Sequence, residues 1–279
     1  MIRDYKQVED YIKSLKITKT QRFDCYGTIE YEQIGKQQLY VIQKGNPNNN
    51  RKIVLSAVFH GEEPAGYKAI KRFLETESDK YLDDFHVIIY PLINPTGYSR
   101  DSRYNLFGQD PNRHFGEKTF KKRICKETRY MQNSLLKIIK KQKIELNLSL
   151  HEDKQMMQYK NEKKRNFYLH ESGDKTIDNC IAEVIIQSVR QIFPINKENY
   201  IHGLKNNSGI IRMTDDYLRR YPYEMDSFLI KKKLVQTSIF TETATCYSLE
   251  KRIKAHIEAI KTAFAYLKQK NLDINSIAA

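Results

Sequence analysis

The amino-acid sequence predicts an α/β protein in which helices cover a layered, mainly parallel β-sheet. Apolar runs of strand length alternate along the chain with amphipathic segments of helix length. The runs at residues 53–59 and 87–93 are nearly all apolar, as in strands that are buried on both faces. Strands and helices that alternate in this way pack as a sheet covered by its crossover helices.

The first elements of the chain are a helix, a hairpin and a strand that leads into a second helix. Residues 4–16 have one apolar face, which predicts a short amphipathic helix. Residues 26–43 alternate in polarity and are rich in β-branched and aromatic residues, which predicts a hairpin. The strand at residues 53–59 ends at His60, and Pro64 suits the first turn of a helix over residues 64–75.

The rest of the chain continues this alternation, interrupted by two stretches rich in turn-forming residues. The expected strands cover residues 87–93, 144–150, 166–169 and 237–241, and the expected helices cover residues 118–142, 176–193 and 248–270. Residues 98–116 and 194–233 are expected to be irregular, because they carry scattered Gly, Pro and polar side chains. Without a repeat or a clear linker, we expect one domain over residues 1–279, with the helix and hairpin of residues 1–45 packed on it.

The composition indicates a folded protein with a heavily charged surface. The 279 residues include 19 Tyr and 12 Phe, enough for a sizeable core, and the formal net charge is +14. This charge fits lysine-rich helix faces in water, and it also fits attraction to an acidic partner. No zinc-finger, RNP or Walker pattern accompanies the lysines, so a nucleic-acid partner is not expected.

The cysteines and the N-terminus bear on the cellular compartment. The four cysteines are far apart and form no CxxC pair, which argues against a cysteine zinc site and a disulfide framework. The N-terminus lacks the apolar segment of a Sec signal peptide, and no apolar run is long enough to span a membrane. We therefore expect a cytoplasmic protein without a membrane partner, although export by a non-Sec route would leave the same sequence. Nothing in the sequence fixes an oligomeric state.

Polar side chains follow several of the predicted strands. His60, Asn94, His151 and Glu242 each come just after an apolar run. In mainly parallel sheets ligands gather at the carboxyl ends of the strands. We therefore expect these four side chains to lie close together at one edge of the sheet.

Three of the candidate residues have the chemistry of a metal site. His60 and Glu63 are three residues apart at a strand-to-helix junction, so both side chains face one point. His151 is the natural third ligand, and two histidines with a carboxylate can bind zinc with one position left open. A helix-capping Glu and structural histidines would produce the same residues without a metal.

The remaining candidates can supply charge stabilisation and a base. Arg103 and the pair Asn112-Arg113 lie in one loop, where arginine can hold a carboxylate or a developing negative charge. Surface solvation is the alternative for each arginine. Glu242 interrupts a buried strand, and burial would raise its pKa toward the range useful to a general base. An ion pair or a helix cap is the structural alternative.

At these positions the chain resembles the M14 family of zinc carboxypeptidases, in particular the short bacterial branch without an activation pro-segment. The shared motifs follow the order of the family over residues 50–265. They are His-Gly-Glu-Glu-Pro-Ala-Gly at 60–66, Asn-Pro-Thr-Gly at 94–97, Arg-Tyr-Asn at 103–105, Gly-Gln-Asp-Pro-Asn-Arg-His-Phe at 108–115, Leu-His-Glu-Asp at 150–153, Asn-Phe-Tyr-Leu-His-Glu at 166–171, Ser-Gly-Ile-Ile-Arg at 208–212, and Thr-Glu-Thr at 241–243 followed by Arg252, His256 and Ala259.

The resemblance implies a three-layer α/β/α sandwich around a mixed, mainly parallel twisted sheet. It implies one zinc ion (Zn2+) per chain, held by His60, Glu63 and His151. It further implies that Glu242 activates water and passes the proton to the leaving amine, and that Arg103 stabilises the oxyanion.

The resemblance also implies that Asn112 and Arg113 hold the terminal carboxylate of a substrate. The family usually has Leu where this chain has Pro111, which leaves both of these positions intact. The distance of Asp226 before Glu242 in the sequence suggests that it lines a specificity pocket that favours basic side chains. The tyrosine that covers the substrate in the family has three candidates here, Tyr217, Tyr221 and Tyr223.

The implied activity is hydrolysis of the C-terminal peptide bond of a peptide. An alternative is a zinc-dependent N-acyl-amino-acid deacylase like aspartoacylase and succinylglutamate desuccinylase, which share the metal and arginine motifs. The expected substrate is therefore a peptide or an N-acyl amino acid with a free carboxylate. A third hypothesis, an inactive peptide-binding module, is disfavoured because all the key residues are present.

Overall fold

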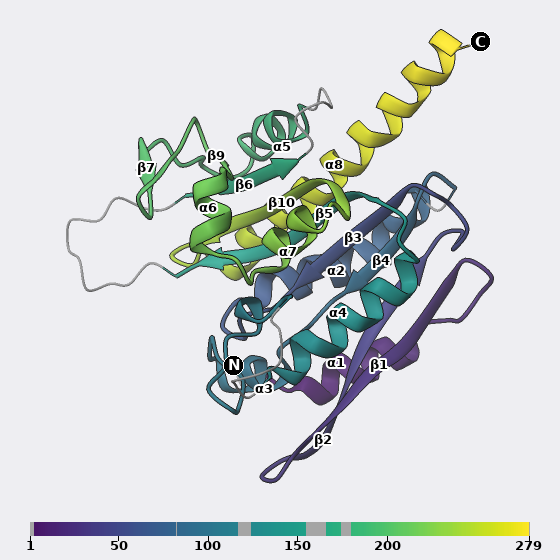
Figure 1. The fold of residues 1–279 in the computed structure, drawn as a ribbon, viewed down its shortest axis with the longest axis vertical. Helices are drawn as coiled ribbons and strands as arrows, with labels where there is room; N and C mark the ends of the chain where they lie inside the picture. Colours follow the sequence, from purple (N-terminus) through teal and green to yellow (C-terminus); the bar gives the residue numbers. More distant parts are fainter. Residues whose placement is uncertain (1–2, 82, 117–123, 155–165, 174–179, 279) are drawn as a thin grey trace.

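The computed structural model describes residues 3–81, 83–116, 124–154, 166–173 and 180–278, with only the backbone of residues 272–278 (Figure 1). Within these residues a mixed eight-stranded sheet has the order β1-β2-β4-β3-β5-β10-β6-β9. Its strands are β1 (Gln21–Tyr31), β2 (Gly35–Lys44), β3 (Lys52–Ala57), β4 (His86–Tyr90), β5 (Ile144–Asp153), β6 (Tyr168–Gly173), β9 (Ile210–Arg212) and β10 (Val235–Ala244). The central strands β4, β3, β5 and β10 run parallel, whereas β1, β2 and β6 add antiparallel pairs. The predicted α/β class with a mixed, mainly parallel sheet is confirmed.

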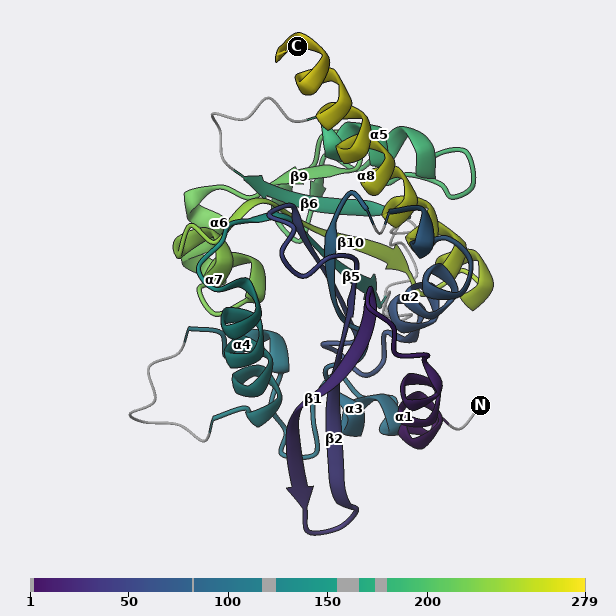
Figure 2. The ribbon, with the colours of Figure 1, turned by 90° about the vertical axis from the view of Figure 1, so that its right-hand side faces the viewer.

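Helices cover both faces of the sheet, as Figure 2 shows from the edge. One face packs against α1 (Tyr5–Ser14), α2 (Pro64–Thr76), α5 (Ile181–Val189) and α8 (Leu249–Ala278). The other face packs against α4 (Lys126–Ile139) and α7 (Met225–Lys231). In β3, Ile53 and Leu55 join the first core and Val54 joins the second, because successive side chains of a strand point to opposite faces. The predicted three-layer sandwich is confirmed.

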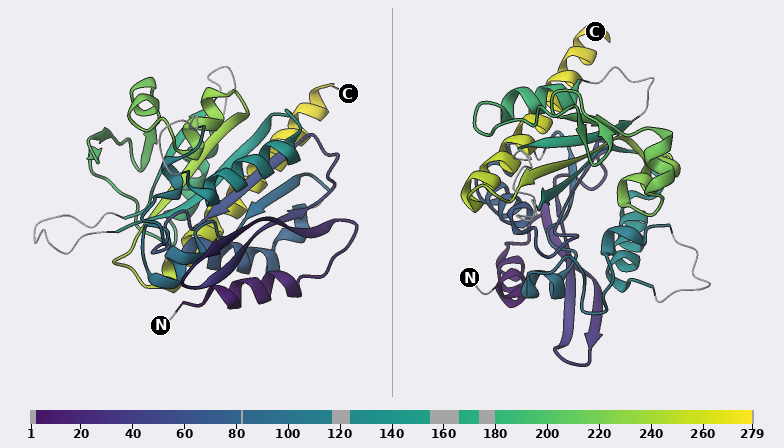
Figure 3. Two further views of the ribbon diagram at one scale, coloured as in Figure 1. Left: turned by 60° about the horizontal axis from the view of Figure 1, so that its bottom comes forward. Right: turned by 90° about the vertical axis from the view of Figure 1, so that its left-hand side faces the viewer.

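The N-terminal hairpin is part of the main sheet. Strand β2 pairs with β4 with Ile42 opposite Ile89, while the tip of the hairpin extends away from the body (Figure 3). Both strands are longer than the sequence predicts, because solvent-exposed polar side chains at the edge weaken the apolar pattern. No helix in the described part of the chain is long and apolar enough to cross a membrane.

Several predicted boundaries differ from the structure. The helix expected over residues 118–142 is described only from Lys126, since residues 117–123 lie outside the described part, and it ends at Ile139. It ends there because Lys140 and Lys141 adopt left-handed backbone angles, with φ of 49° and 66°. Residues 176–179 of the helix expected over residues 176–193 also lie outside the described part. Helix α8 extends eight residues past the end that the sequence predicts for it, at residue 270.

The two stretches expected to be irregular contain short elements. The first holds the second half of α3 (Pro95–Arg100) and a 3-10 turn, η2 (Pro111–Arg113). The second holds β7 (Tyr200–Ile201), β8 (Leu204–Lys205), β9, α6 (Asp215–Arg220) and α7. These elements are too short for a periodic pattern, and contacts with the sheet and its neighbours stabilise them.

The expected placement of polar residues just beyond the strand ends is wrong for two of them. His151 lies inside β5 and Glu242 lies inside β10, near the carboxyl end of each strand. The parallel register pairs Glu242 with His151, so their side chains leave the sheet on the same face. That face is the one covered by α7, and it leads into a cavity.

Candidate active site

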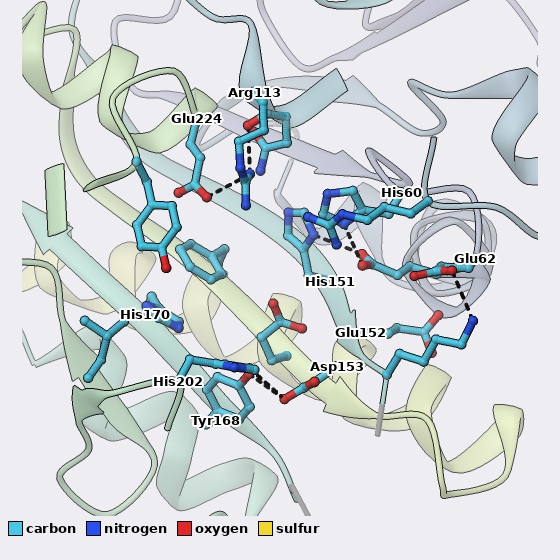
Figure 4. Close-up of a pocket in the computed structure, with 18 of the residues that line it drawn as sticks. His60, Glu62, Arg113, His151, Glu152, Asp153, Tyr168, His170, His202 and Glu224 are labelled. Atoms are coloured by element: carbon cyan, nitrogen blue, oxygen red, sulfur yellow. Dashed lines mark hydrogen bonds and ion pairs between the residues drawn. The ribbon is translucent and has the colours of Figure 1, made fainter. Parts of the chain in front are cut away.

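A cavity of about 510 Å³ opens at the carboxyl ends of the central strands (Figure 4). Its lining contains all seven residues that were expected to bind the metal, to bind the substrate or to act in catalysis. They are His60, Glu63, Arg103, Asn112, Arg113, His151 and Glu242. The four segments that carry them are far apart in the sequence, and the parallel sheet brings them together. Asn94 has a different position and acts on the backbone behind the cavity.

His60, Glu63 and His151 form a buried cluster whose ligand atoms all lie within 4.8 Å of one another. His60 Nδ1 lies 2.6 Å from one Glu63 oxygen, and His151 Nδ1 lies 2.9 Å from the other. Burial alone would raise the pKa of the Glu63 carboxyl, but the two histidine rings lower it well below its usual value. An ionised carboxylate and two imidazole nitrogens that converge on one point form a set of donors that fits zinc.

The backbone before His60 has an unusual conformation that aims the histidine at the cluster. Val58 has a φ of 56°, which is strained for a β-branched residue. Asn94 holds this segment, because its backbone N–H donates to Val58 O at 3.0 Å and its side-chain amide donates to Phe59 O at 3.2 Å. Asn94 therefore supports the position of His60 rather than lining the cavity.

Gly61 is required by a close backbone contact. A Cβ atom at this position would lie 1.8 Å from the carbonyl carbon of Gly97, at the start of α3. We expect Gly61→Ala to destabilise the protein by about 3 kcal/mol, because backbone on both sides must shift. Chemical denaturation measures this change. Gly108→Ala is the control, since no atom lies within 4 Å of its Cβ and only its left-handed backbone adds strain, about 1 kcal/mol. Equal losses in both variants would contradict the contact argument.

Arg103 and His60 share one carboxylate, that of Asp110. Arg103 Nε donates to Asp110 Oδ2 at 3.0 Å, and His60 Nε2 lies 3.2 Å from Asp110 Oδ1. Burial would raise the pKa of Asp110, but His60 and Arg103 outweigh it and hold the carboxyl ionised. A carboxylate behind a ligating histidine fixes the orientation of the ring. Asp110 therefore orients both His60 and the arginine beside it.

Asn112 and Arg113 lie in the 3-10 turn that follows Asp110. The backbone N–H of Met225 donates to Asn112 Oδ1 at 3.0 Å, which fixes the side-chain amide with its N–H2 group free to donate elsewhere. Arg113 Nη1 donates to the carbonyl of Asn112 at 2.9 Å and lies 2.8 Å from Glu224 Oε1. Within the described residues Arg113 Nε and Nη2 have no hydrogen-bond partner, so one edge of the guanidinium is open.

Glu242 is paired in strand register with His151, one of the three residues of the buried His–Glu–His cluster. Its Oε2 atom is buried and has no hydrogen-bond partner within the described residues. Burial raises the pKa of Glu242 well above its usual value, and the carboxylates of Glu63 and Asp153 raise it further, while Arg103 opposes them. An unpartnered carboxylate with a raised pKa has the properties of a general base.

The structure also distinguishes between the candidates for the tyrosine that covers the substrate, and it places Asp226. Tyr217 and Tyr221 line the cavity, whereas Tyr223 is not part of the lining. Asp226 is 1% exposed and is not among the lining residues either. It accepts hydrogen bonds from Asn147 Nδ2 and Ser238 Oγ, which attaches α7 to the sheet below the cavity. The expectation that Asp226 reads the substrate therefore lacks support in the geometry.

Several residues that line the cavity were not predicted from the sequence. Glu224 lies at the start of α7. The one sequence feature that could have indicated its role is its position between a tyrosine-rich segment and Asp226. His170 lies on β6 and stacks on Phe240 with ring centroids 4.0 Å apart, and burial lowers its pKa to about 3. It faces the cavity away from the metal cluster and belongs to the wall opposite His60 (Figure 4).

The comparisons with known proteins agree with this site. The family model for zinc carboxypeptidases, peptidase family M14, matches residues 10–258. The chain therefore belongs to the zinc carboxypeptidase family, a family of zinc-dependent hydrolases, and its buried His–Glu–His cluster is of the kind such an enzyme needs. No curated protein sequence matches the chain.

Solved structures show the same fold at low sequence identity. A protein designated a metallopeptidase from Shewanella amazonensis has a TM-score of 0.74 and 23% identity, over 94% of this chain and 91% of that one. A protein designated carboxypeptidase A from Shewanella denitrificans has a TM-score of 0.66 and 16% identity, over 95% and 69%. A succinylglutamate desuccinylase from a Silicibacter species has a TM-score of 0.58 and 13% identity, over 91% and 69%. The fold is thus shared by proteins designated as peptidases and as a deacylase.

Proposed function

We propose that this protein is a zinc metallocarboxypeptidase, which hydrolyses the last peptide bond of a peptide with a free C-terminal carboxylate. The observation that carries this proposal is the open edge of Arg113 beside Asn112, in the same cavity as the metal cluster and Glu242. A terminal carboxylate bound there would orient the adjacent amide toward His60 and His151. Release of a single C-terminal amino acid, detected by mass spectrometry, tests the proposal.

The metal would be held by His60, Glu63 and His151, whose donor atoms already converge. Bound there, a zinc ion would supply a water molecule with a lowered pKa and would polarise a carbonyl group. Glu242 accepts the proton of the attacking water and delivers it to the nitrogen of the leaving amine. Its unpartnered Oε2 atom leaves this carboxylate free to do so.

Arg103 and Arg113 divide the negative charge of the substrate between them. Arg103 donates to the carbonyl oxygen as it becomes negative, and Asp110 holds the guanidinium in place for this purpose. Arg113 and the side-chain amide of Asn112 bind the terminal carboxylate. The clamp confines cleavage to the end of a chain, because an internal residue has no carboxylate to bind.

Arg113→Ala is expected to raise KM for a peptide with a free C-terminus by about 30-fold or more, since one partner of a charged hydrogen bond is lost. Steady-state kinetics on a peptide and on its C-terminal amide measure the effect. The slow cleavage of the amide should not change, because it offers no carboxylate. Arg113→Lys keeps the charge without the planar fork and should lie between the two. An equal effect on both substrates would refute the clamp role.

A second candidate activity is hydrolysis of N-acyl amino acids. It is favoured by the shared fold with a succinylglutamate desuccinylase, and its substrates also carry a free carboxylate beside the scissile amide. Blocked dipeptides assayed beside N-acyl amino acids with the same terminal residue separate the two activities. Cleavage of the N-acyl amino acids alone would replace the peptidase proposal with the deacylase.

A further inference from the structure

Arg113 already binds a carboxylate that belongs to the protein. Glu224 Oε1 lies 2.8 Å from Arg113 Nη1, and Figure 4 shows the two side chains pointing toward each other. The other oxygen of Glu224 accepts a hydrogen bond from the buried Tyr217 hydroxyl at 2.6 Å. Glu224 is 5% exposed, yet it lines the cavity. This carboxylate is therefore a fixed part of the clamp.

The backbone around Glu224 is held firmly. Met225 donates to Asn112, so the residue after Glu224 is hydrogen-bonded to the clamp itself. One residue further, Asp226 attaches α7 to Asn147 and Ser238 on the sheet. Movement of Glu224 away from Arg113 would leave a buried carboxylate without its cation, which is costly. A substrate must accordingly bind with Glu224 in place.

A simple carboxylate at this clamp would create a charge imbalance. Two carboxylates on one guanidinium leave a net negative charge next to the buried Glu224, and their repulsion opposes binding. A positive group on the substrate next to its carboxylate removes this imbalance. The surroundings do not oppose a cation, because six carboxylate side chains line the cavity and outnumber the three Arg and Lys side chains together with the two charges of a bound zinc ion. The rings of Tyr217 and Phe240 add aromatic walls, which cations prefer.

We propose that Glu224 is a specificity-determining residue that makes the clamp select C-terminal residues with a positively charged side chain, such as lysine or ornithine. This inference rests on the proposed function, in that the clamp must hold a terminal carboxylate. Arg113 binds the carboxylate of the terminal residue through its open edge, and Glu224 binds the ammonium group. Neutral and acidic terminal residues bind poorly, because they leave Glu224 ionised next to a second carboxylate.

The test compares two small ligands that differ by one charge. Hexanoate has only a carboxylate, whereas 6-aminohexanoate has a carboxylate and an ammonium group like a lysine without its α-amine. Neither contains an amide, so binding to the zinc-loaded protein requires no turnover and is independent of which hydrolase activity the protein has. Isothermal titration calorimetry should show 6-aminohexanoate binding about tenfold more tightly than hexanoate, as expected for one close charge pair.

Glu224→Gln should abolish this preference, because glutamine keeps the hydrogen bond with Tyr217 but not the charge. Glu62→Gln is the matched control. Glu62 lines the same cavity, but its charge is offset by Lys154, so its loss should leave most of the preference in place. A preference that survives in Glu224→Gln, or the absence of saturable binding of 6-aminohexanoate to the unaltered protein, would overturn the inference.

A second measurement uses the unaltered protein and does not depend on the folding of a variant. Burial raises the pKa of Glu224 to about 7, against the opposing effects of Arg113 and the Tyr217 hydroxyl. Asp226, His60 and Glu242 are the other charged or titratable groups that act on it. Below pH 7 Glu224 becomes neutral, so hexanoate should bind more tightly at pH 6 than at pH 8, and 6-aminohexanoate should lose its advantage. A ratio of affinities that is independent of pH would contradict the role of Glu224.

Discussion

Glu242→Gln is expected to reduce kcat by about 10³-fold, the typical contribution of a general acid–base group. Glutamine has nearly the same size, but it can neither accept the proton of water nor deliver one to a leaving amine. Glu242 is half-buried with a fully buried Oε2 atom, and it lies in register with His151 on the neighbouring strand, which is why we propose it for both transfers. Single-turnover kinetics with the zinc-loaded variant measure the loss.

The zinc content of this variant provides the control. Glu242 is not part of the His–Glu–His cluster, so Glu242→Gln should bind as much zinc as the unaltered protein. A loss of turnover at full zinc content assigns the effect to proton transfer. Turnover within tenfold of the unaltered protein would show that another group is the base.

His151→Ala is expected to lower the zinc content from about one ion per chain to nearly none, and to reduce turnover to background. Two remaining ligands bind the metal too weakly to keep it during dialysis. Atomic absorption and activity measured on the same sample check this expectation. His170→Asn is the matched control, since His170 lies in the same cavity but outside the cluster, and this variant should retain its zinc. Loss of zinc from both variants would contradict the assignment of the ligands.

The sequence predicts the parts of the fold that depend on local pattern. The buried runs of β3 and β4 are almost entirely apolar, and Pro64 marks the start of α2, so these elements were expected close to where they lie. The same holds for the His–Glu–His cluster, because His60 and Glu63 are only three residues apart in the sequence. Residues such as these carry their signal within a short stretch of chain.

Contacts between distant segments are not visible in this way. Asp110 supports both His60 and Arg103, but its role appears only when the sheet brings residues 60, 103 and 110 together. Glu224 pairs with Arg113 across more than a hundred residues of sequence. Asp226 has the spacing of a pocket residue, yet packing of α7 turns it toward Asn147. In each case long-range packing decides between the alternatives that the sequence leaves open.

The net charge of the whole chain also does not predict the charge of the side chains that line the cavity. A net charge of +14 suggests an acidic partner, but the lining of the cavity is rich in carboxylates. Of the described Lys and Arg residues, only Arg103, Arg113 and Lys154 line the cavity, and the others act on solubility and encounter rather than on recognition within the site. The acidic lining is what a terminal residue meets when it enters the clamp.

The most direct test of the account treats the zinc-loaded protein with a peptide and with its C-terminal amide, and follows both by mass spectrometry. The free peptide is expected to lose its last residue, and the amide to remain almost intact, because the proposed clamp of Arg113 and Asn112 requires a carboxylate. Cleavage of the amide at a similar rate, or cleavage at internal bonds, would contradict a carboxylate clamp next to a catalytic metal.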